Sequence, residues 1–411
     1  MKKIGKKFNR REFMKTSTLG AASLGLWGRP RNASSQPPFA PEPQGSQKTV
    51  IQRELGRTGI RIPVVNMGVM NAFNGELVKK SYDIGVRYFD TAAWYMRGFN
   101  EEMVGRALKE LGVRNDVVIG TKVYFPHPQR NLSDTELRDK FLEIANQSLI
   151  RLQTDHVDIL FLHEVRTLPY LNRPGIMEAL SKLKQEGKTR AIGFSTHTHM
   201  NELIGEATKG GFYDVVETAF NYAMKDDRTY TATLKKAAEK GIGLIAMKTQ
   251  CTQYWYREFV PHEGASYYEG KILHTAVLKW VLRHPFITTA IPGYTTFQQM
   301  EEDFSVAHGL SYTPEEAQFL SDRGVIDKLA YCRQCHRCVD SCPREVQIPS
   351  LMRAHLYATC YPNVAQARDA LAEPPTAKGI DACRTCRDCL AVCRNGIDIA
   401  RRIDELRLMF A

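Results

Sequence analysis

Between residues 62 and 292, short apolar runs alternate with longer amphipathic stretches eight times. The runs carry the β-branched and aromatic residues of strands, and the stretches, such as 136–152 and 174–186, have apolar residues at helical spacing. Eight strand–helix units in about 250 residues predict a (β/α)8 TIM barrel of the α/β class. The predicted strands are 62–70, 88–92, 117–123, 157–165, 189–196, 215–221, 241–249 and 288–292.

Polar residues stand at the ends of three successive predicted strands. Asp90, Lys122 and His163 each interrupt or end an apolar run, and Tyr95 follows the first of them in a loop. The C-terminal ends of the strands form the active face of such a barrel. An ammonium that a carboxylate holds beside a phenol can tune that phenol as a proton donor. Any one of these residues alone would be an ordinary core or strand-end side chain, but together they predict a catalytic site.

This set of residues, in this order, resembles the catalytic tetrad of the aldo-keto reductases. The resemblance extends from about residue 53 to residue 307 and includes the sequences RELGRTG at 53–59 and AIPG at 290–293. It implies an enzyme that acts on a small carbonyl or alcohol substrate by hydride transfer with NAD(P)H.

The resemblance also implies a role for each member of the tetrad. Tyr95 would protonate the carbonyl oxygen while the nicotinamide delivers hydride to the carbon. Lys122 would lower the pKa of Tyr95, Asp90 would hold Lys122, and His163 would orient the carbonyl.

Four further residues are candidates for binding the nicotinamide cofactor. Ser195 matches the serine that binds the carboxamide in the family, and Glu217 stands in place of the family's glutamine. Lys248 is either a pyrophosphate ligand or an ordinary exposed lysine. Gly293 lies where a basic residue often binds the 2′-phosphate of NADPH. The identity of the nicotinamide, and its presence, therefore stay open.

Nine of the ten cysteines follow residue 330, and eight of them form two runs with C-x2-C-x2-C-x3-C spacing. Thiolates at this spacing bind [4Fe-4S] clusters, and in two-cluster ferredoxins the fourth cysteine of each run ligates the other cluster. Zinc and disulfides are the alternatives, but zinc sites usually join two cysteine pairs across a long gap. The runs predict two [4Fe-4S] clusters with the ligands Cys332, Cys335, Cys338, Cys342, Cys383, Cys386, Cys389 and Cys393.

The residues around the two runs predict a small α-helical, ferredoxin-like domain. Apolar patterns at 346–349 and 397–399 follow the runs and would pack over the clusters, and 350–356 and 365–371 are predicted as short helices between them. Cys251 and Cys360 lie outside the runs and are predicted to be ordinary thiols.

The N-terminal segment has a basic start, the pair Arg10 and Arg11, and a mildly apolar run up to Trp27. It resembles a twin-arginine signal, which the Tat export machinery reads. We therefore expect a cytoplasmic precursor that is exported to the periplasm or another extracytoplasmic space. A disordered basic tail is the alternative, and cleavage of the signal stays open.

The predicted organisation is a signal region at 1–28, a linker at 29–48, the barrel at 49–308, a connecting helix at 309–330 with its helical pattern at 314–329, and the dicluster domain at 331–411. Part of the net charge of +11 comes from the signal region, and no basic block interleaved with aromatic residues follows it, so we expect no nucleic-acid partner. No stretch approaches the roughly 20 apolar residues of a transmembrane span.

A hydride carries two electrons and each cluster carries one. The sequence therefore predicts an oxidoreductase that couples carbonyl or alcohol chemistry to a one-electron redox partner. The alternatives are an electron-transfer or assembly subunit with a catalytically silent barrel, and a conventional reductase with structural clusters.

Overall fold

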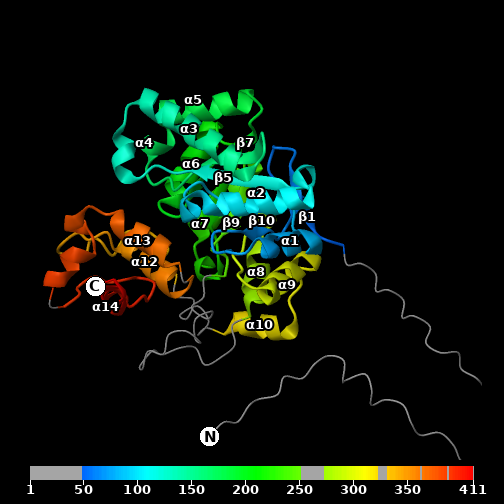
Figure 1. Ribbon diagram of the computed structural model, residues 1–411. Coiled ribbons are helices and arrows are strands. Elements are labelled where there is room, and N and C mark those ends of the chain that lie inside the picture. Colours follow the sequence, from blue (N-terminus) through cyan, green and yellow to red (C-terminus); the bar gives the residue numbers. More distant parts are fainter. Residues whose placement is uncertain (1–48, 251–272, 323–330, 362, 387, 411) are drawn as a thin grey trace, which may run out of the picture. The chain divides into compact units, whose positions relative to one another are not determined.

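The computed structural model describes residues 49–250, 273–322, 331–361, 363–386 and 388–410 (Figure 1). The predicted signal region, the predicted linker and Cys251 lie outside these residues.

Eight parallel strands form one sheet, and each strand pairs with its neighbours in chain order. Each is followed by a connection that returns to the same end of the sheet, which is the (β/α)8 arrangement that the sequence predicts. The strands are β3 (Met67–Gly68), β4 (Tyr88–Asp90), β5 (Val118–Val123), β6 (Val157–Leu162), β7 (Thr189–Thr196), β8 (Val215–Ala219), β9 (Gly243–Met247) and β10 (Thr289–Ala290).

The first and last strands close the sheet into a barrel. Ala290 bridges Val65 in parallel, and its amide donates to the Val64 carbonyl at 2.9 Å while its carbonyl accepts from the Asn66 amide at 2.9 Å. Because no open edge remains between β10 and β3, the backbone groups at this seam are paired as they are elsewhere in the sheet.

The predicted strand 62–70 is wrong as a single strand. The chain instead forms an antiparallel pair, β1 (Gln52–Glu54) with β2 (Arg61–Pro63), before β3 enters the barrel. The Val64 amide still donates to the Ile51 carbonyl at 3.0 Å, and the chain then leaves this pair. Leu55 and Ile62 beside this pair are fully buried with Tyr88 and Ile159 in one apolar cluster, so the hairpin closes the N-terminal end of the barrel.

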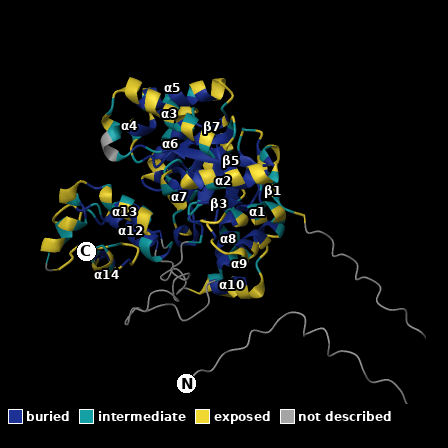
Figure 2. Ribbon diagram, viewed as in Figure 1, coloured by how far each residue is buried: buried dark blue, intermediate teal, exposed yellow. Residues whose placement is uncertain are grey.

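Helices surround the sheet, and their inward faces are apolar. In α3, Leu137, Phe141, Ala145 and Leu149 recur every four residues and are all buried. Figure 2 shows the strands dark blue within helices whose outer turns are exposed. The helices are α1 (Gly75–Ile84), α2 (Phe99–Leu111), α3 (Asp134–Leu152), α4 (Leu168–Leu171), α5 (Pro174–Gln185), α6 (Met200–Gly210), α7 (Arg228–Glu239), α8 (His274–Leu282) and α9 (Phe297–Ser305).

The C-terminal residues add helices α10 (Pro314–Ser321), α12 (Ile348–Thr359), α13 (Val364–Ala372) and α14 (Ile399–Met409). The connecting helix predicted for 314–329 ends at Ser321, where Asp322 turns to an extended backbone, and 323–330 lie outside the described residues. The two short helices predicted between the cysteine runs are confirmed as parts of α12 and α13. Both apolar patterns pack in one core with Cys338, α12 and α14.

None of the helices in the described part of the chain is both long and apolar enough to cross a membrane.

Candidate active site

The four predicted catalytic residues meet at the C-terminal end of the barrel strands. Asp90 ends β4, Lys122 lies in β5, His163 directly follows β6, and Tyr95 opens a short 3₁₀ turn, Tyr95–Gly98. The Lys122 side chain is completely buried, and its Nζ donates to the Asp90 carboxylate and, at 2.9 Å, to the Thr91 carbonyl. The predicted contact between Asp90 and Lys122 is therefore present.

Glu217 joins this pair from β8. Its Oε2 lies 3.3 Å from Lys122 Nζ. Burial and then the charge of Asp90 raise the pKa of Glu217 to about 8. Burial tends to lower the pKa of Lys122, but the two carboxyl groups outweigh it and raise that pKa. At neutral pH the site therefore holds an ammonium, one carboxylate and one protonated carboxylic acid.

The phenol of Tyr95 has a pKa well above its usual value, because it is buried and because Asp90 and Glu217 lie near it. Lys122 Nζ is 5.3 Å from the centre of the Tyr95 ring. Burial and the nearby carboxyl groups act against the lowering that the resemblance implies for Lys122, and that role stays a prediction. A phenol of this kind keeps its proton at neutral pH until an acceptor beside it becomes negatively charged.

His163 faces Tyr95 across the site. Their rings meet edge to face with centroids 5.6 Å apart, and Tyr124 packs against the same imidazole at 5.7 Å. Burial lowers the pKa of His163 to about 3, so the ring is neutral at neutral pH. Its Nδ1 is buried and has no hydrogen-bond partner among the described residues. This geometry leaves the imidazole free to orient a polar group of a ligand.

Trp94 and Tyr124 are site residues that the sequence reasoning missed. Their rings lie 4.9 Å apart, and Tyr124 also contacts His163. Each is directly next to a predicted catalytic stretch, Trp94 before Tyr95 and Tyr124 two residues after Lys122. Their position next to the catalytic residues in the sequence is the signal by which both could have been predicted.

The residues that follow the catalytic positions have unusual backbone conformations. Met96, Glu164 and Lys248 have φ angles of 51°, 53° and 53°, in the left-handed region that non-glycine residues rarely adopt. Met96 follows Tyr95, Glu164 follows His163, and Lys248 follows the last residue of β9. Such strained residues are concentrated at functional sites in proteins.

The predicted cofactor residues are only partly brought together. Ser195 and Glu217 are partners in the register of β7 and β8. Ser195 is buried and its Oγ accepts from the Glu164 amide at 3.0 Å. Lys248 is half-buried, with its Nζ 3.2 Å from the Tyr357 hydroxyl on α12, so it is not an ordinary exposed lysine, and the pyrophosphate role stays a prediction. Gly293 follows β10, and a side chain there would approach the Gly68 carbonyl at 3.5 Å.

Helix α12 and its neighbours cover this end of the barrel. Arg353 on α12 is buried, and its guanidinium is 2.6 Å from His197 Nε2 just after β7. The Trp94 indole donates to Asp369 on α13 at 2.9 Å. These contacts join residues more than 150 positions apart, so local sequence patterns held no signal for them.

The cysteines of the two runs lie near one another in a crossed pattern. Burial, and then the negative charges of Cys338, Cys335 and Cys393, act to raise the pKa of Cys332 to about 12. Burial, with Cys342, Cys386 and Cys389, raises the pKa of Cys383 to about 11. Cys393 therefore lies near the first run and Cys342 near the second, and Cys342 also lies near Cys338.

The described cysteines form no disulfide with one another. All nine described cysteines are free thiols. Cys360, predicted to be an ordinary thiol, is buried beside Thr359. Among the described residues, no three His, Cys, Asp or Glu side chains are grouped closely enough to hold a single metal ion.

Glu217 is expected to impose a pH dependence on catalysis. Its ionisation near pH 8 adds a negative charge that raises the pKa of Tyr95 further, so carbonyl reduction should fall as the pH rises through about 8. Glutamine can accept a hydrogen bond from Lys122 and donate one to Asp90, as the protonated acid does. Glu217→Gln should therefore keep its activity at pH 7. Its kcat/KM should no longer fall as the pH rises through about 8.

The same substitution should alter stability. The pKa of Glu217 is about 8 in the native state against an ordinary value of 4.5. The native state therefore binds more protons between these values, and the wild type should lose stability as the pH rises through that window. In urea unfolding, the free energy of unfolding of Glu217→Gln should fall less than that of the wild type as the pH rises through this window. The exposed Glu202→Gln is the matched control, and an unchanged profile in Glu217→Gln would exclude this role.

The barrel, the buried Lys122 with its carboxylates, and the neutral His163 define an oxidoreductase-type (β/α)8 protein. The model of the aldo/keto reductase family matches residues 68–251. Glyoxal reductase of Bacillus subtilis is 30% identical over 238 residues, which is 56% of this chain and 78% of that protein. The chain therefore belongs to the aldo/keto reductase family and is an aldo-keto reductase-type oxidoreductase.

Solved structures share the fold. The holo form of the aldo-keto reductase AKR11C1 from Bacillus halodurans aligns with a TM-score of 0.54 and 24% identity, over 69% of this chain and 97% of that one. An aldo/keto reductase from Klebsiella pneumoniae, solved in complex with NADP and acetate, aligns with a TM-score of 0.50 and 23% identity, over 67% and 94% of the two chains.

Proposed function

We propose that the protein interconverts a carbonyl and an alcohol by hydride transfer in the barrel, and that this reaction is coupled to one-electron transfer through two [4Fe-4S] clusters. The observation that carries the proposal is that both cysteine runs belong to a segment whose helix α12 contacts the catalytic end of the barrel. A one-electron partner would then exchange electrons with the clusters.

The chain's own residues would manage the proton. Neutral His163 orients the carbonyl oxygen, and the phenol of Tyr95 holds the proton that this oxygen receives. When the proton leaves, the ammonium of Lys122 stabilises the negative charge of the Tyr95 phenolate. Asp90 keeps that ammonium in place. Burial strengthens these interactions because the protein interior screens charge less than water.

Ser195 is the residue that would hold the carboxamide of a bound nicotinamide. It is buried at the end of β7, and although its Oγ already accepts from Glu164, its own O–H can still donate. When bound, the nicotinamide supplies the hydride. Lys248, predicted near the pyrophosphate, would first have to leave Tyr357.

The spacing of the cysteines in the sequence supports two cubane clusters. Cys332, Cys335, Cys338 and Cys393 would hold one cluster, and the set of Cys383, Cys386, Cys389 and Cys342 would hold the other. Four thiolates with one drawn from the opposite run are the ligand set of a two-cluster ferredoxin. When bound, the clusters supply one-electron transfer.

Metal analysis of anaerobically purified protein tests the cluster half of the proposal. About eight iron atoms and about eight sulfides per chain are expected, with a paramagnetic signal after reduction by dithionite. Bound zinc, or no iron after anaerobic reconstitution, would contradict it. Aldehyde reduction by the same preparation reports on the barrel separately.

We also propose export by the twin-arginine route, since Arg10 and Arg11 precede an apolar run. A receptor reads this signal by residue identity and not by charge. Replacing both arginines with lysine should therefore retain the protein in the cytoplasm, as cell fractionation would show. Normal export of the double-lysine protein would favour a basic tail.

A further inference from the structure

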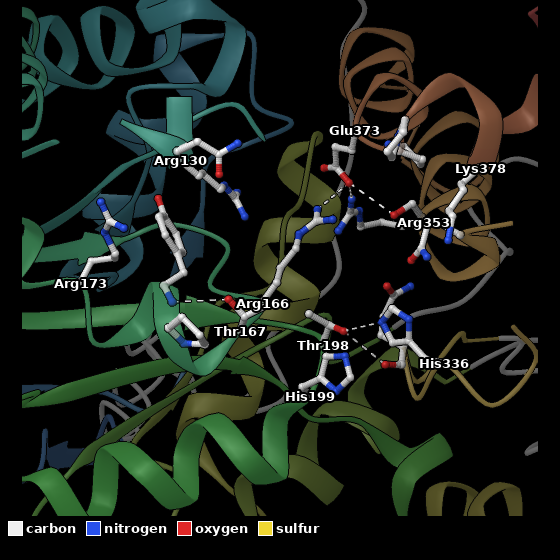
Figure 3. Close-up of a pocket in the computed structure, with 18 residues that line it drawn as sticks. Arg130, Arg166, Thr167, Arg173, Thr198, His199, His336, Arg353, Glu373 and Lys378 are labelled. Atoms are coloured by element: carbon white, nitrogen blue, oxygen red, sulfur yellow. Dashed lines mark hydrogen bonds and ion pairs between the residues drawn. The ribbon is translucent and has the colours of Figure 1, made fainter. Parts of the chain in front are cut away.

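A cavity of about 700 Å³ lies beside the catalytic residues, between the loops that follow β5, β6 and β7 and the segment from Gln334 to Lys378 (Figure 3). Five cationic side chains and one carboxylate, that of Glu373, are among its lining residues. The cations are Arg130, Arg166, Arg173, Arg353 and Lys378.

Carboxylates offset most of this positive charge. Arg166 and Arg353 both pair with Glu373, and Arg166 also pairs with Glu164 at 3.1 Å. Figure 3 shows these two guanidinium groups converging on Glu373. Outside the lining, Asp134 pairs with Arg173 at 3.0 Å, and Glu345 pairs with Lys378 at 2.7 Å.

Arg130 is different. Its Nε donates to the Phe125 carbonyl at 2.9 Å, and its guanidinium lies over the rings of Tyr170 and Tyr124, at 4.7 and 5.4 Å from their centroids. Within the described part of the chain, no carboxylate pairs with it. The stacked rings hold the guanidinium in place while its two terminal nitrogens keep their donors.

Two histidines form part of the opposite wall of the cavity. His199 and His336 stack with centroids 4.7 Å apart, and His336 Nε2 lies 2.9 Å from the Thr198 hydroxyl. The backbone at both histidines and at Gln334 is left-handed, with φ angles of 46°, 60° and 52°, so this wall is also strained.

The cavity is linked to the catalytic residues through a side chain behind its wall. Tyr124, which lies under Arg130, packs edge to face on His163, and Arg166 is only three residues beyond His163. A small molecule whose carbonyl lies at His163 could therefore extend toward Arg130.

We propose that this cavity binds an anionic group of the substrate, a carboxylate or a phosphate, with Arg130 as its main ligand. The inference rests on the proposed function and narrows the substrate to a carbonyl or alcohol that carries such a group. Arg130 supplies a forked, permanently charged donor, which suits both anions. Glu373 competes with the ligand for Arg166 and Arg353.

Isothermal titration of the purified full chain with succinate, its neutral isostere succinamide, and inorganic phosphate tests the site. Succinate or phosphate should bind, and succinamide should bind at least tenfold more weakly. Arg130→Gln should weaken anion binding by about 10- to 100-fold, because a charge-assisted hydrogen bond is lost. The exposed Arg106→Gln on α2 is the matched control and should bind like the wild type.

A second variant changes the charge in the opposite direction. Glu373→Gln removes the competing carboxylate, so it should strengthen binding of the anion. If these charged side chains only held the structure together, Arg130→Gln and Glu373→Gln would both bind the anion more weakly. Equal affinity for succinate and succinamide, or wild-type affinity in Arg130→Gln, would overturn the proposal. The preferred anion distinguishes a carboxylate from a phosphate substrate.

Calorimetry needs no turnover, so the two proposals fail separately. Anion binding without any carbonyl reduction would contradict the proposed function alone. Reduction of neutral aldehydes by a chain that binds no anion would contradict this inference alone.

Discussion

Tyr95→Phe is expected to lower carbonyl reduction by roughly 10²- to 10⁴-fold, the usual contribution of a positioned general acid. The phenol is the buried, protonated group beside His163, and phenylalanine keeps its ring while removing the proton. Steady-state kcat/KM with a panel of aldehydes measures the effect.

The control for this variant is binding. Cofactor and anion affinities should stay close to those of the wild type, because only a hydroxyl is lost. Tyr82→Phe on α1 removes a partly exposed hydroxyl that contacts Asp116 before β5, at the end of the strands opposite the catalytic residues, and should keep full activity. Full activity in Tyr95→Phe would remove this residue from the mechanism.

Cys342→Ser is expected to damage the cluster whose other ligands lie about forty residues further along the chain, because Cys342 lies with Cys383, Cys386 and Cys389. Loss of a thiolate weakens coordination directly, and metal binding is coupled to folding. Iron content and the paramagnetic spectrum of the reduced protein should both change.

Cys360→Ser is the matched control, because Cys360 is buried but lies outside both sets. Its iron content should stay at about eight per chain. A Cys342→Ser protein with unchanged iron and an unchanged spectrum would show that the runs do not share ligands.

The barrel and the catalytic residues could be predicted because both depend on short-range patterns. Strand period and length mark the strands, and Asp90, Lys122 and His163 take their places at strand ends without knowledge of distant contacts. The predicted strand 62–70 was wrong because its first residues pair with β1 in a hairpin, whereas Met67 and Gly68 pair with β4 in the barrel.

What escaped prediction depends on contacts between distant residues. Glu217 turns toward Lys122 because of the register between β7, β8 and β9, and it then opposes the effect of Lys122 on Tyr95. Arg353 and Glu373 lie in ordinary helical surroundings in the sequence, and only the fold brings them to His197 and Arg166. Local patterns carry no information on such pairs.

The most direct test of the coupled function is anaerobic mixing of oxidised, cluster-loaded protein with NADH or NADPH while the visible absorption of the clusters is followed. The account predicts that the nucleotide is oxidised, that the clusters become reduced, and that two cluster electrons appear for each hydride. Carbonyl turnover with clusters that stay oxidised would contradict the coupling and leave a conventional reductase. Binding of neither nucleotide, with no turnover, would favour a catalytically silent barrel.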